Sequence, residues 1–410
     1  MANAVCRSCC NPLQHLFVDL RTAPLSNNFL RLEQLNQGSI HYPLRVFVCE
    51  QCLLVQLEQF ESPRDIFEEY AYFSSYSSSW LSHARQYVNT IIPRLSLGTS
   101  SSVVEIASND GYLLQYFTPY GIPVLGIEPA RNVAKHAEAK GVPTVSEFFT
   151  LAFAKQLVSK QGTADLIIGN NVLAHVPELQ DFVAGLKTLL APTGTITLEF
   201  PHLLRLIKDN QFDTIYHEHF SYLSLLSVSH LFARYGLAVY DVEEWPTHGG
   251  SLRVFARHAE YAELADSPHV EEMLRQETAY GLRNIATYSR FPEQVKAVKE
   301  EVYRFLFQAS RENKQVVAYG APAKGNTLLN YLGVGIDYIN YTVDKSPYKQ
   351  DLFLPGSRIP IYAPARIQET KPDYIIILPW NLREEIEQEL QYSREWGAKL
   401  VVCIPKLEIY

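Results

Sequence analysis

The sequence predicts an α/β protein with three parts. A small β-rich, metal-binding domain comes first, a central doubly wound parallel sheet follows, and a second, Rossmann-like unit ends the chain. Three observations predict this order: two Cys-X-X-Cys pairs near the N-terminus, β-branched runs that alternate with helical stretches from about residue 101, and a second alternation from about residue 315. Strands that alternate with helices form parallel sheets that are covered on both faces. The length of 410 residues suits two or three domains.

The composition is that of an ordinary globular protein, with 47% hydrophobic and 20% charged residues. No apolar run reaches the roughly 18 residues that a membrane helix needs, and the first ten residues lack the apolar core of a signal peptide. We therefore expect a cytoplasmic protein with reduced thiols and no membrane partner. The net charge of -8 argues against a nucleic-acid partner, which needs a basic face. A small anionic ligand is compatible with this charge, because a local cluster of donors can hold a phosphate.

Four of the six cysteines form the pairs Cys6-Arg-Ser-Cys9 and Cys49-Glu-Gln-Cys52. Two intervening residues allow both thiolates of a pair to face one cation from a tight turn, and two such turns complete a tetrahedron. Buried or redox thiols are the alternative, but two matched pairs in a reduced compartment favour zinc. Because four thiolates close the coordination shell, we expect a structural zinc ion. The predicted zinc-binding domain spans residues 1–68, with a β-rich insert between the pairs.

The central domain is predicted over residues 69–260. Its strand candidates are residues 103–106, 122–127, 165–168 and 194–198, and its helix candidates include residues 132–140 and 178–190. Ligands of such sheets bind at the carboxyl ends of the strands. The informative loops are therefore residues 105–111, 128–130 and 169–176, which follow the first three strands.

These loops favour a nucleoside cofactor. Glu128, at the end of the second strand, can accept both hydroxyls of a ribose. The first loop opens a helix, but only Gly111 supplies the expected glycine, because Ala107 and Asn109 stand where a dinucleotide fold needs bare backbone against a pyrophosphate. A cofactor without phosphates tolerates this pattern, whereas NAD tolerates it less well.

The densest chemistry lies in residues 212–222, which hold two His, one Glu, one Asp and two Tyr. The spacing is not His-Glu-X-X-His, which excludes the metalloprotease motif. His217 and His219 would share a face on a strand but not on a helix. An imidazole that titrates near neutrality can take a proton from carbon and return it elsewhere, and Glu218 could orient a substrate donor or hold a histidine tautomer. A purely structural role for the histidines is the alternative.

A helical linker is predicted over residues 261–314 and a Rossmann-like domain over residues 315–410. The strand candidates of this domain are residues 315–320, 338–343, 374–378 and 400–404, and its helix candidates are residues 328–332 and 382–390. Small residues at 321–323 before a helix suit a diphosphate, and Lys324 adds a positive charge. Lys349 follows the next strand. A packing or regulatory domain without a ligand is the alternative.

Residues 103–176 resemble a class I methyltransferase that binds S-adenosylmethionine. The resemblance implies a cofactor site formed by Glu105, Ala107, Asn109, Gly111, Glu128, Phe148, Asn170 and Asn171. In this family the first loop approaches the methionine part of the cofactor and the second-strand acid holds the ribose. Phe148 is then expected to stack on adenine, and residues 169–171 to close over the sulfonium.

Nearly the whole chain resembles the sugar C-methyltransferases of branched deoxysugar biosynthesis. The matching pieces are the four cysteines and residues 70–77, 105–111, 216–219, 248–253 and 319–326. The resemblance implies a 4-keto deoxysugar carried by thymidine diphosphate, with His219 removing the C3 proton and the resulting enolate carbon taking the methyl group. The implied catalytic residues are His219, Tyr216, Glu218, His175 and Tyr76. The implied substrate-binding residues are Tyr72, Tyr76, Tyr222, Lys324, Asn326 and Lys349.

Two other functions compete with this interpretation. One is an NAD-dependent nucleotide-sugar dehydrogenase or epimerase with two Rossmann units, and the other is a non-catalytic nucleotide-sugar sensor with a zinc-bound head. The missing glycines of the first loop disfavour the former, and the dense cluster at residues 216–219 disfavours the latter. We expect a monomer or weak dimer that acts on a small molecule.

Overall fold

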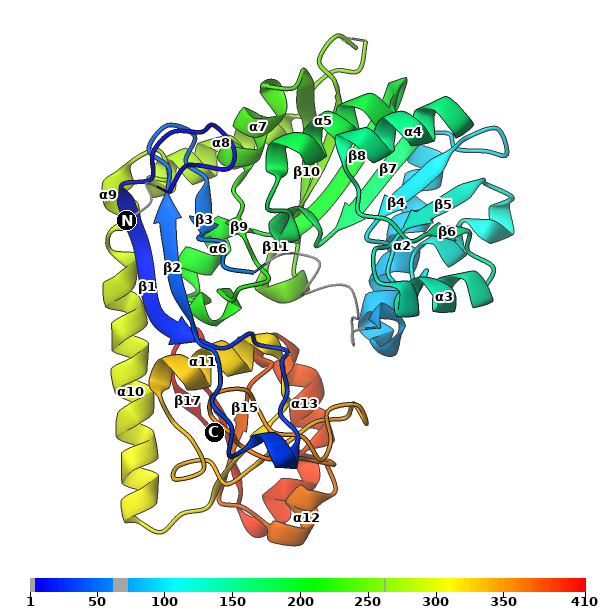
Figure 1. Ribbon diagram of the computed structural model, residues 1–410. Helices are drawn as coiled ribbons and strands as arrows, with labels where there is room; N and C mark the ends of the chain where they lie inside the picture. The colour runs from blue at the N-terminus through cyan, green and yellow to red at the C-terminus, as the bar shows by residue number, and fades with distance from the viewer. Residues whose placement is uncertain (1–3, 62–72, 262) are drawn as a thin grey trace.

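The computed structural model describes residues 4–61, 73–261 and 263–410, and these residues build three sheets (Figure 1). The central sheet lies at the upper right of Figure 1 and the C-terminal sheet lies below it. The N-terminal sheet and one long helix run along the left side, next to both. None of the helices among the described residues combines the length and the apolar character that a membrane span requires.

The N-terminal sheet is antiparallel, and the central domain contributes its last strand. Its order is β1 (His15–Ala23), β2 (Tyr42–Val48), β3 (Val55–Leu57) and β9 (Ser221–Tyr222). Val55 pairs with Tyr222, and the Leu57 N–H donates to the Phe220 carbonyl at 3.0 Å. The end of the segment at residues 212–222 is therefore joined by backbone hydrogen bonds to the domain that carries the cysteines.

The central sheet has seven strands. Their order is β10 (Leu237–Trp245), β11 (Ser251–His258), β8 (Leu190–Pro201), β7 (Ala164–Asn170), β4 (Val103–Ile106), β5 (Val124–Ile127) and β6 (Thr144–Val145). The strands from β8 to β6 pair in parallel, and β11 is antiparallel to both neighbours. The chain order reverses between β4 and β7, which makes their carboxyl ends the expected ligand site.

Helices cover both faces of this sheet because alternate strand residues point to opposite sides. Val104 and Ile106 pack with one set of helices, and Val103 packs with the other. The first set is α4 (Leu151–Gln161), α5 (Leu179–Leu189) and α7 (Leu225–Ala233). The second set is α2 (Ser78–Arg94) and α3 (Arg131–Ala139). The predicted doubly wound arrangement is confirmed.

The C-terminal sheet is parallel except at one edge. Its order is β14 (Ile361–Tyr362), β13 (Thr342–Val343), β12 (Val316–Tyr319), β15 (Tyr374–Ile377), β16 (Lys399–Val402) and β17 (Glu408–Ile409), of which β17 is antiparallel. Its helices are α11 (Ala323–Leu332), α12 (Arg366–Thr370) and α13 (Arg383–Glu389). The helix predicted at residues 328–332 begins earlier, directly after Pro322, whose fixed φ suits the start of a helix.

The segment between the two Rossmann-like sheets consists of α8 (Pro268–Tyr280), α9 (Ile285–Tyr288) and α10 (Phe291–Arg311). Its last helix is amphipathic and packs along β1, with the Phe291 ring stacked on Phe17 at 4.6 Å. One continuous apolar cluster joins β1, α10 and α11. This helical segment therefore shares its core with the N-terminal and C-terminal sheets.

Short helices connect the longer elements and carry several of the candidate residues. They are η1 (Leu32–Gln34), η2 (Ser74–Tyr76), η3 (Leu114–Tyr116), η4 (Thr118–Tyr120), η5 (Leu173–His175), α6 (Leu203–Lys208), η6 (Phe212–Thr214), η7 (Thr247–Gly249), η8 (Trp380–Leu382) and η9 (Gln391–Trp396). The elements η5, η6, η7 and η8 recur in the site described next.

Candidate active site and zinc site

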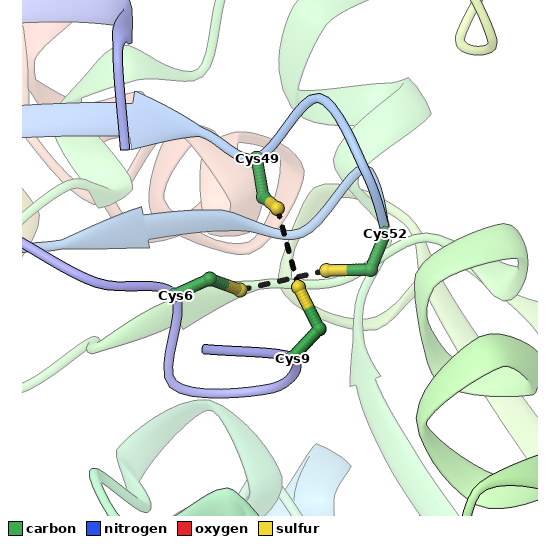
Figure 2. A group of neighbouring side chains, drawn as sticks. All are labelled: Cys6, Cys9, Cys49 and Cys52. Carbon is green, nitrogen blue, oxygen red and sulfur yellow. Dashed lines mark hydrogen bonds between the residues drawn. The ribbon is translucent and has the colours of Figure 1, made fainter. Parts of the chain in front are cut away.

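Four cysteine sulfurs converge at one point in the N-terminal domain (Figure 2). The sulfurs all lie within 4.8 Å of one another, and both Cys6–Cys52 and Cys9–Cys49 are separated by 3.5 Å. A tetrahedral zinc–thiolate site has Zn–S bonds of about 2.3 Å, which places its sulfurs about 3.8 Å apart. The cysteines form no disulfide, so all four thiols are available as ligands. The geometry fits one zinc ion with a closed shell.

The loop after β4 adopts a glycine-type backbone with two residues that are not glycine. Ala107, Asn109 and Gly111 have φ angles of 55°, 49° and 75°. Asparagine tolerates the left-handed region, but an alanine there costs on the order of 1–2 kcal/mol because its Cβ approaches the following carbonyl. Such strain persists only where the surrounding structure enforces it, and it is concentrated at functional sites.

Glu128 closes the other side of this loop. Its two carboxylate oxygens accept hydrogen bonds from the Asn109 and Ala130 N–H groups, both at 2.9 Å. Burial raises the pKa of Glu128, and these two hydrogen bonds oppose the rise. Each oxygen retains a second lone pair that can accept a ribose hydroxyl.

Asn170 and Asn171 lie at the end of β7, beside the loop. The Asn170 side chain donates to the Tyr112 hydroxyl at 3.2 Å, and the Asn171 N–H donates to the Glu199 carbonyl at 2.7 Å. The Oδ1 atom of Asn171 is buried and has no hydrogen-bond partner among the described residues. A buried acceptor without a donor is costly, and a polar ligand would satisfy it.

Glu105 and Phe148 have different surroundings. Glu105 is fully buried, and this burial raises its pKa well above the usual range. Phe148 is partly exposed in the segment between β6 and α4. The loop at residues 107–111, Glu128 and the Asn171 amide thus lie at the carboxyl ends of β4, β5 and β7. The free acceptor sites on Glu128 and Asn171 fit a nucleoside cofactor whose hydroxyls and amine donate hydrogen bonds.

Two histidines from different loops meet edge to face. The rings of His175 and His219 have centroids 4.7 Å apart at 66°. The Nδ1–H of His175 donates to the Glu218 carbonyl at 2.7 Å, and the Nδ1–H of His219 donates to the Thr214 carbonyl at 2.8 Å. Because a carbonyl only accepts, each contact places the proton on Nδ1 and makes Nε2 the basic nitrogen.

Both histidines are held neutral. Burial lowers the pKa of His175 to about 4 and lowers that of His219 well below its usual range. The positive charge of Lys324 and the neighbouring His175 lower the pKa of His219 further. The Tyr216 hydroxyl donates to His219 Nε2 at 2.8 Å. The site therefore holds two neutral imidazoles at pH 7, with a phenol beside one of them.

The predicted roles of the neighbouring residues separate in the structure. The Glu218 carboxylate accepts from the Asn27 side chain at 2.7 Å, so its backbone carbonyl, and not its side chain, sets the His175 tautomer. His217 turns away to the Pro43 carbonyl at 3.2 Å. Residues 217 and 218 form a turn, so the two histidines do not share the face that a strand would have given them.

The structure places the predicted tyrosines differently. Tyr222 is buried with its ring edge toward His219, at 6.4 Å. Tyr76 is 70% exposed and its hydroxyl meets Tyr348 of the C-terminal domain, so the structure does not bring Tyr76 to the histidines. Tyr72 lies outside the described residues.

The C-terminal domain docks directly on the histidine segment. The Trp380 Nε1–H donates to Asp213 at 2.7 Å, and Thr327 donates to the Ile215 carbonyl at 2.9 Å. Lys324 lies over the Trp380 ring and donates to Asn381 at 2.7 Å. Burial raises the pKa of Asp213 to about 6 and lowers that of Lys324.

The other two predicted substrate residues also lie near the N-terminus of α11. Asn326 is buried and donates to the Ser26 carbonyl at 2.6 Å. Lys349 donates to the Ala321 carbonyl at 3.0 Å. The Oδ1 atom of Asn326 has no hydrogen-bond partner within the described part of the chain.

Comparison with known proteins identifies the family. C-methyltransferase NovU from Streptomyces niveus is 37% identical over 401 residues, which span 98% of this chain and 95% of that protein. This chain belongs to the C-methyltransferase family. Three family models agree: the "Putative zinc binding domain" matches residues 6–67, the "Methyltransferase domain" residues 80–242 and the "C-methyltransferase C-terminal domain" residues 246–405.

Two solved structures are similar to part of this C-methyltransferase. Magnesium protoporphyrin IX methyltransferase from Synechocystis PCC 6803, with bound S-adenosylmethionine, is 16% identical and covers 43% of this chain and 80% of its own, with a TM-score of 0.32. A methyltransferase of Anabaena variabilis is 14% identical and covers 44% and 86%, with a TM-score of 0.37.

The family membership settles the cofactor question. S-adenosylmethionine is the methyl donor, the central domain has the predicted methyltransferase fold, and the N-terminal domain is a zinc-binding domain. The dehydrogenase alternative is thereby replaced by methyl transfer to carbon. The residues present fit this cofactor, because the Asn171 amide and Glu128 offer acceptors for a nucleoside and residues 107–111 hold only one glycine.

Sequence reasoning missed a buried charged network next to this site. Glu199, at the end of β8, accepts from His83 at 2.8 Å, Arg253 at 2.6 Å and Thr247 at 2.9 Å. Burial opposes ionisation of Glu199, but His83 and Arg253 lower its pKa to about 2. The available signal was a charged residue at the end of a predicted strand, on the sheet edge where ligands bind. His248, in the segment that reads His-Gly-Gly, was also not assigned a role.

Proposed function

We propose that this C-methyltransferase methylates C3 of a 4-keto deoxysugar carried by thymidine diphosphate, and that His219 is the base that removes the C3 proton. The observation that carries the proposal is the tautomer of His219. Its Nδ1–H donates to the Thr214 carbonyl, so Nε2 carries the basic lone pair, and that lone pair accepts from the Tyr216 hydroxyl. A ketone acidifies the neighbouring C–H enough for an imidazole base, and methylation of carbon requires such a deprotonation.

The geometry supports a division of roles. His219 Nε2 takes the proton, and the Tyr216 hydroxyl leaves Nε2 to donate to a substrate oxygen. His175 lies against the His219 ring and supplies a second neutral imidazole beside it. The Glu218 carbonyl orients His175. The donor would supply a methyl group bound to a positively charged sulfur. The nucleophilic carbon would bond to that methyl carbon as the sulfur–methyl bond breaks.

We assign the cofactor to the edge of β4, β5 and β7. Glu128 would hold the ribose hydroxyls, and the loop at residues 107–111 would approach the methionine part. The buried Asn171 Oδ1 would accept a hydrogen bond from the cofactor. Phe148 would cover the adenine, as the family resemblance implies. The burial of Glu105 supports a place beneath the loop and not in direct contact.

We assign the nucleotide to the junction between the central and C-terminal domains. Lys324 is partly buried there, donates to Asn381, and has no carboxylate within ion-pair distance among the described residues, so a diphosphate would supply its counter-charge. The unpartnered Asn326 Oδ1 and the Lys349 ammonium group lie at the same helix start. We propose that the enzyme acts on this soluble substrate in the cytoplasm as a monomer or weak dimer.

A panel of nucleotide-linked sugars tests the proposal. The protein is incubated with methyl-13C S-adenosylmethionine and with 4-keto and 4-hydroxy deoxysugars on thymidine and uridine diphosphate. We expect a product only from 4-keto sugars, with the labelled methyl bonded to C3 by NMR. A labelled methyl on oxygen or nitrogen, or equal turnover of the 4-hydroxy sugars, would contradict the proposal.

A further inference from the structure

His248 occupies an unusual backbone position at the same site. It lies in η7, between β10 and β11, with a φ angle of 56°, and the following Gly249 and Gly250 have φ angles of 90° and 115°. A bulky residue in the left-handed region is uncommon and needs enforcement by its surroundings. These three residues with positive φ angles form the turn between β10 and β11, and the turn packs against η8 of the C-terminal domain.

Three contacts hold the turn. The Thr247 hydroxyl donates to the buried Glu199 carboxylate at 2.9 Å, and the Gln211 side chain donates to the Gly249 carbonyl at 2.7 Å. Gly249 lies so close to Trp380 that a Cβ atom there would collide with the indole ring. The central domain, the histidine segment and the C-terminal domain thus all fix the position of His248.

His248 lies near the proposed cofactor edge through Trp80, whose indole ring stacks on Tyr112 at 5.9 Å. The His248 ring meets Trp80 edge to face at 5.2 Å, and it lies within electrostatic range of His175, His219 and Lys324. Burial, together with the Lys324 charge, lowers its pKa to about 4, so it is neutral at pH 7.

The Nδ1 atom of His248 is buried and forms no hydrogen bond with the described residues. Among the neighbouring histidines, His83 binds Glu199, His175 binds the Glu218 carbonyl and His202 binds Glu277. The Nδ1 atom of His217 also lacks a partner among the described residues, but that ring turns away from the site to the Pro43 carbonyl. A buried polar group without a partner calls for one, and a histidine kept only for packing would have found it in the fold. A ligand bound beside Trp80 and Trp380 is the partner that remains.

We propose that His248 is a further catalytic residue, a neutral hydrogen-bond donor to the substrate oxygen that gains negative charge when His219 takes the proton. This inference rests on the proposed function. In the step, the C3–H bond breaks, the proton passes to His219 Nε2, and the electron pair moves into the carbon–carbon bond and onto the ketone oxygen. His248 keeps its proton and shares it with that oxygen. A neutral imidazole stabilises an enolate well, because its acidity is close to that of the enol it faces.

Hydrogen exchange at C3 separates this role from methyl transfer. The 4-keto sugar nucleotide is placed in D2O with S-adenosylhomocysteine in place of the methyl donor, and NMR follows the loss of the C3 proton. The test variant is His248→Asn, because asparagine tolerates the left-handed backbone while it removes the ring. The control is His230→Asn, an exposed position on α7.

We expect His248→Asn to slow both exchange and methylation on the order of a hundredfold, with unchanged S-adenosylhomocysteine affinity and melting temperature. The control should match the parent. Exchange within about threefold of the parent, or a change confined to KM, would overturn the inference while the proposed function stands. If the parent neither exchanges nor methylates any 4-keto sugar, both fail.

Discussion

Two groups of ionisable side chains lie side by side in this enzyme, and they are in opposite states. His175 and His219 have no counter-charge, and their pKa values fall so that both are neutral. Glu199 is fully buried, whereas the two histidines are partly buried. His83 and Arg253 surround Glu199 and its pKa falls to about 2, so it is charged. Burial alone does not decide the charge of a group; the partner does. We propose that the neutral group does the chemistry, and the charged group binds Thr247 of η7.

The zinc site lies in the domain that pairs with the segment after His219, and its removal should have the largest effect. The β3–β9 pairing joins the cysteine domain to the histidine turn. We expect a chelator to unfold the N-terminal 60 or so residues, since four-cysteine sites contribute several kcal/mol or more to folding, and to abolish activity. Limited proteolysis and circular dichroism measure this. Cys10→Ser, outside the cluster, should behave as the parent; an N-terminal region that stays protected without zinc would contradict the expectation.

Removing the negative charge of Glu199 should destabilise the charged group. Glu199→Gln leaves the Arg253 guanidinium buried without its closest counter-ion, which should cost about 3–5 kcal/mol of unfolding free energy. Denaturant unfolding measures the loss. The matched control is Glu243→Gln, which removes a longer, partly exposed contact to the same arginine and should cost under about 1 kcal/mol. Equal losses for the two variants would show that the buried Glu199–Arg253 ion pair stabilises the fold no more than the partly exposed Glu243–Arg253 pair.

The neutral side of the comparison predicts a pH dependence of stability. The pKa of His175 is about 4 in the folded protein and about 6.5 when unfolded. The unfolded chain therefore binds more protons between these values, and the His175 contribution to stability is complete above pH 6.5 and is lost as the pH falls toward 4. We expect the unfolding free energy of the parent to fall by on the order of 2 kcal/mol more than that of His175→Gln as the pH is lowered from 6.5 to 4. Identical slopes for parent and variant would place a charged imidazole in the folded state.

The smallest effect should come from the contact that joins the two domains at the histidines. Trp380→Phe keeps an aromatic ring and removes the Nε1–H that binds Asp213, so we expect a loss of about 1–2 kcal/mol and a several-fold fall in kcat/KM. Trp396→Phe, which removes a comparable bond to the Pro372 carbonyl far from the site, should lower stability only. Equal kcat/KM values for the two variants would separate the docking contact from catalysis.

The sequence was sufficient for the regular parts of this molecule. Its β-branched runs predicted β4, β7 and β12 closely, because buried parallel strands need apolar residues throughout. The two cysteine pairs predicted the zinc site, because thiolate spacing is local. Both sheets of the Rossmann type and the methyltransferase fold followed from these signals.

The rest depends on contacts between residues far apart in the chain. The two-residue strand β9 is too short to show a pattern, yet it completes the N-terminal sheet. The bond from Trp380 to Asp213 spans 167 positions, and no local pattern indicates it. The left-handed His248 was signalled only by the two glycines after it. Tyr76 was expected at the sugar and lies at Tyr348 instead, which a one-dimensional motif could not show.

The central claim is that the neutral imidazole of His219 takes a proton from carbon. Hydrogen exchange at C3 of a 4-keto sugar nucleotide, measured in D2O with S-adenosylhomocysteine bound, tests it directly. We predict that His219→Asn slows exchange by about a thousandfold while cofactor affinity stays within twofold of the parent. A variant that exchanges the proton at a near-parent rate would contradict the claim and move the base to His175.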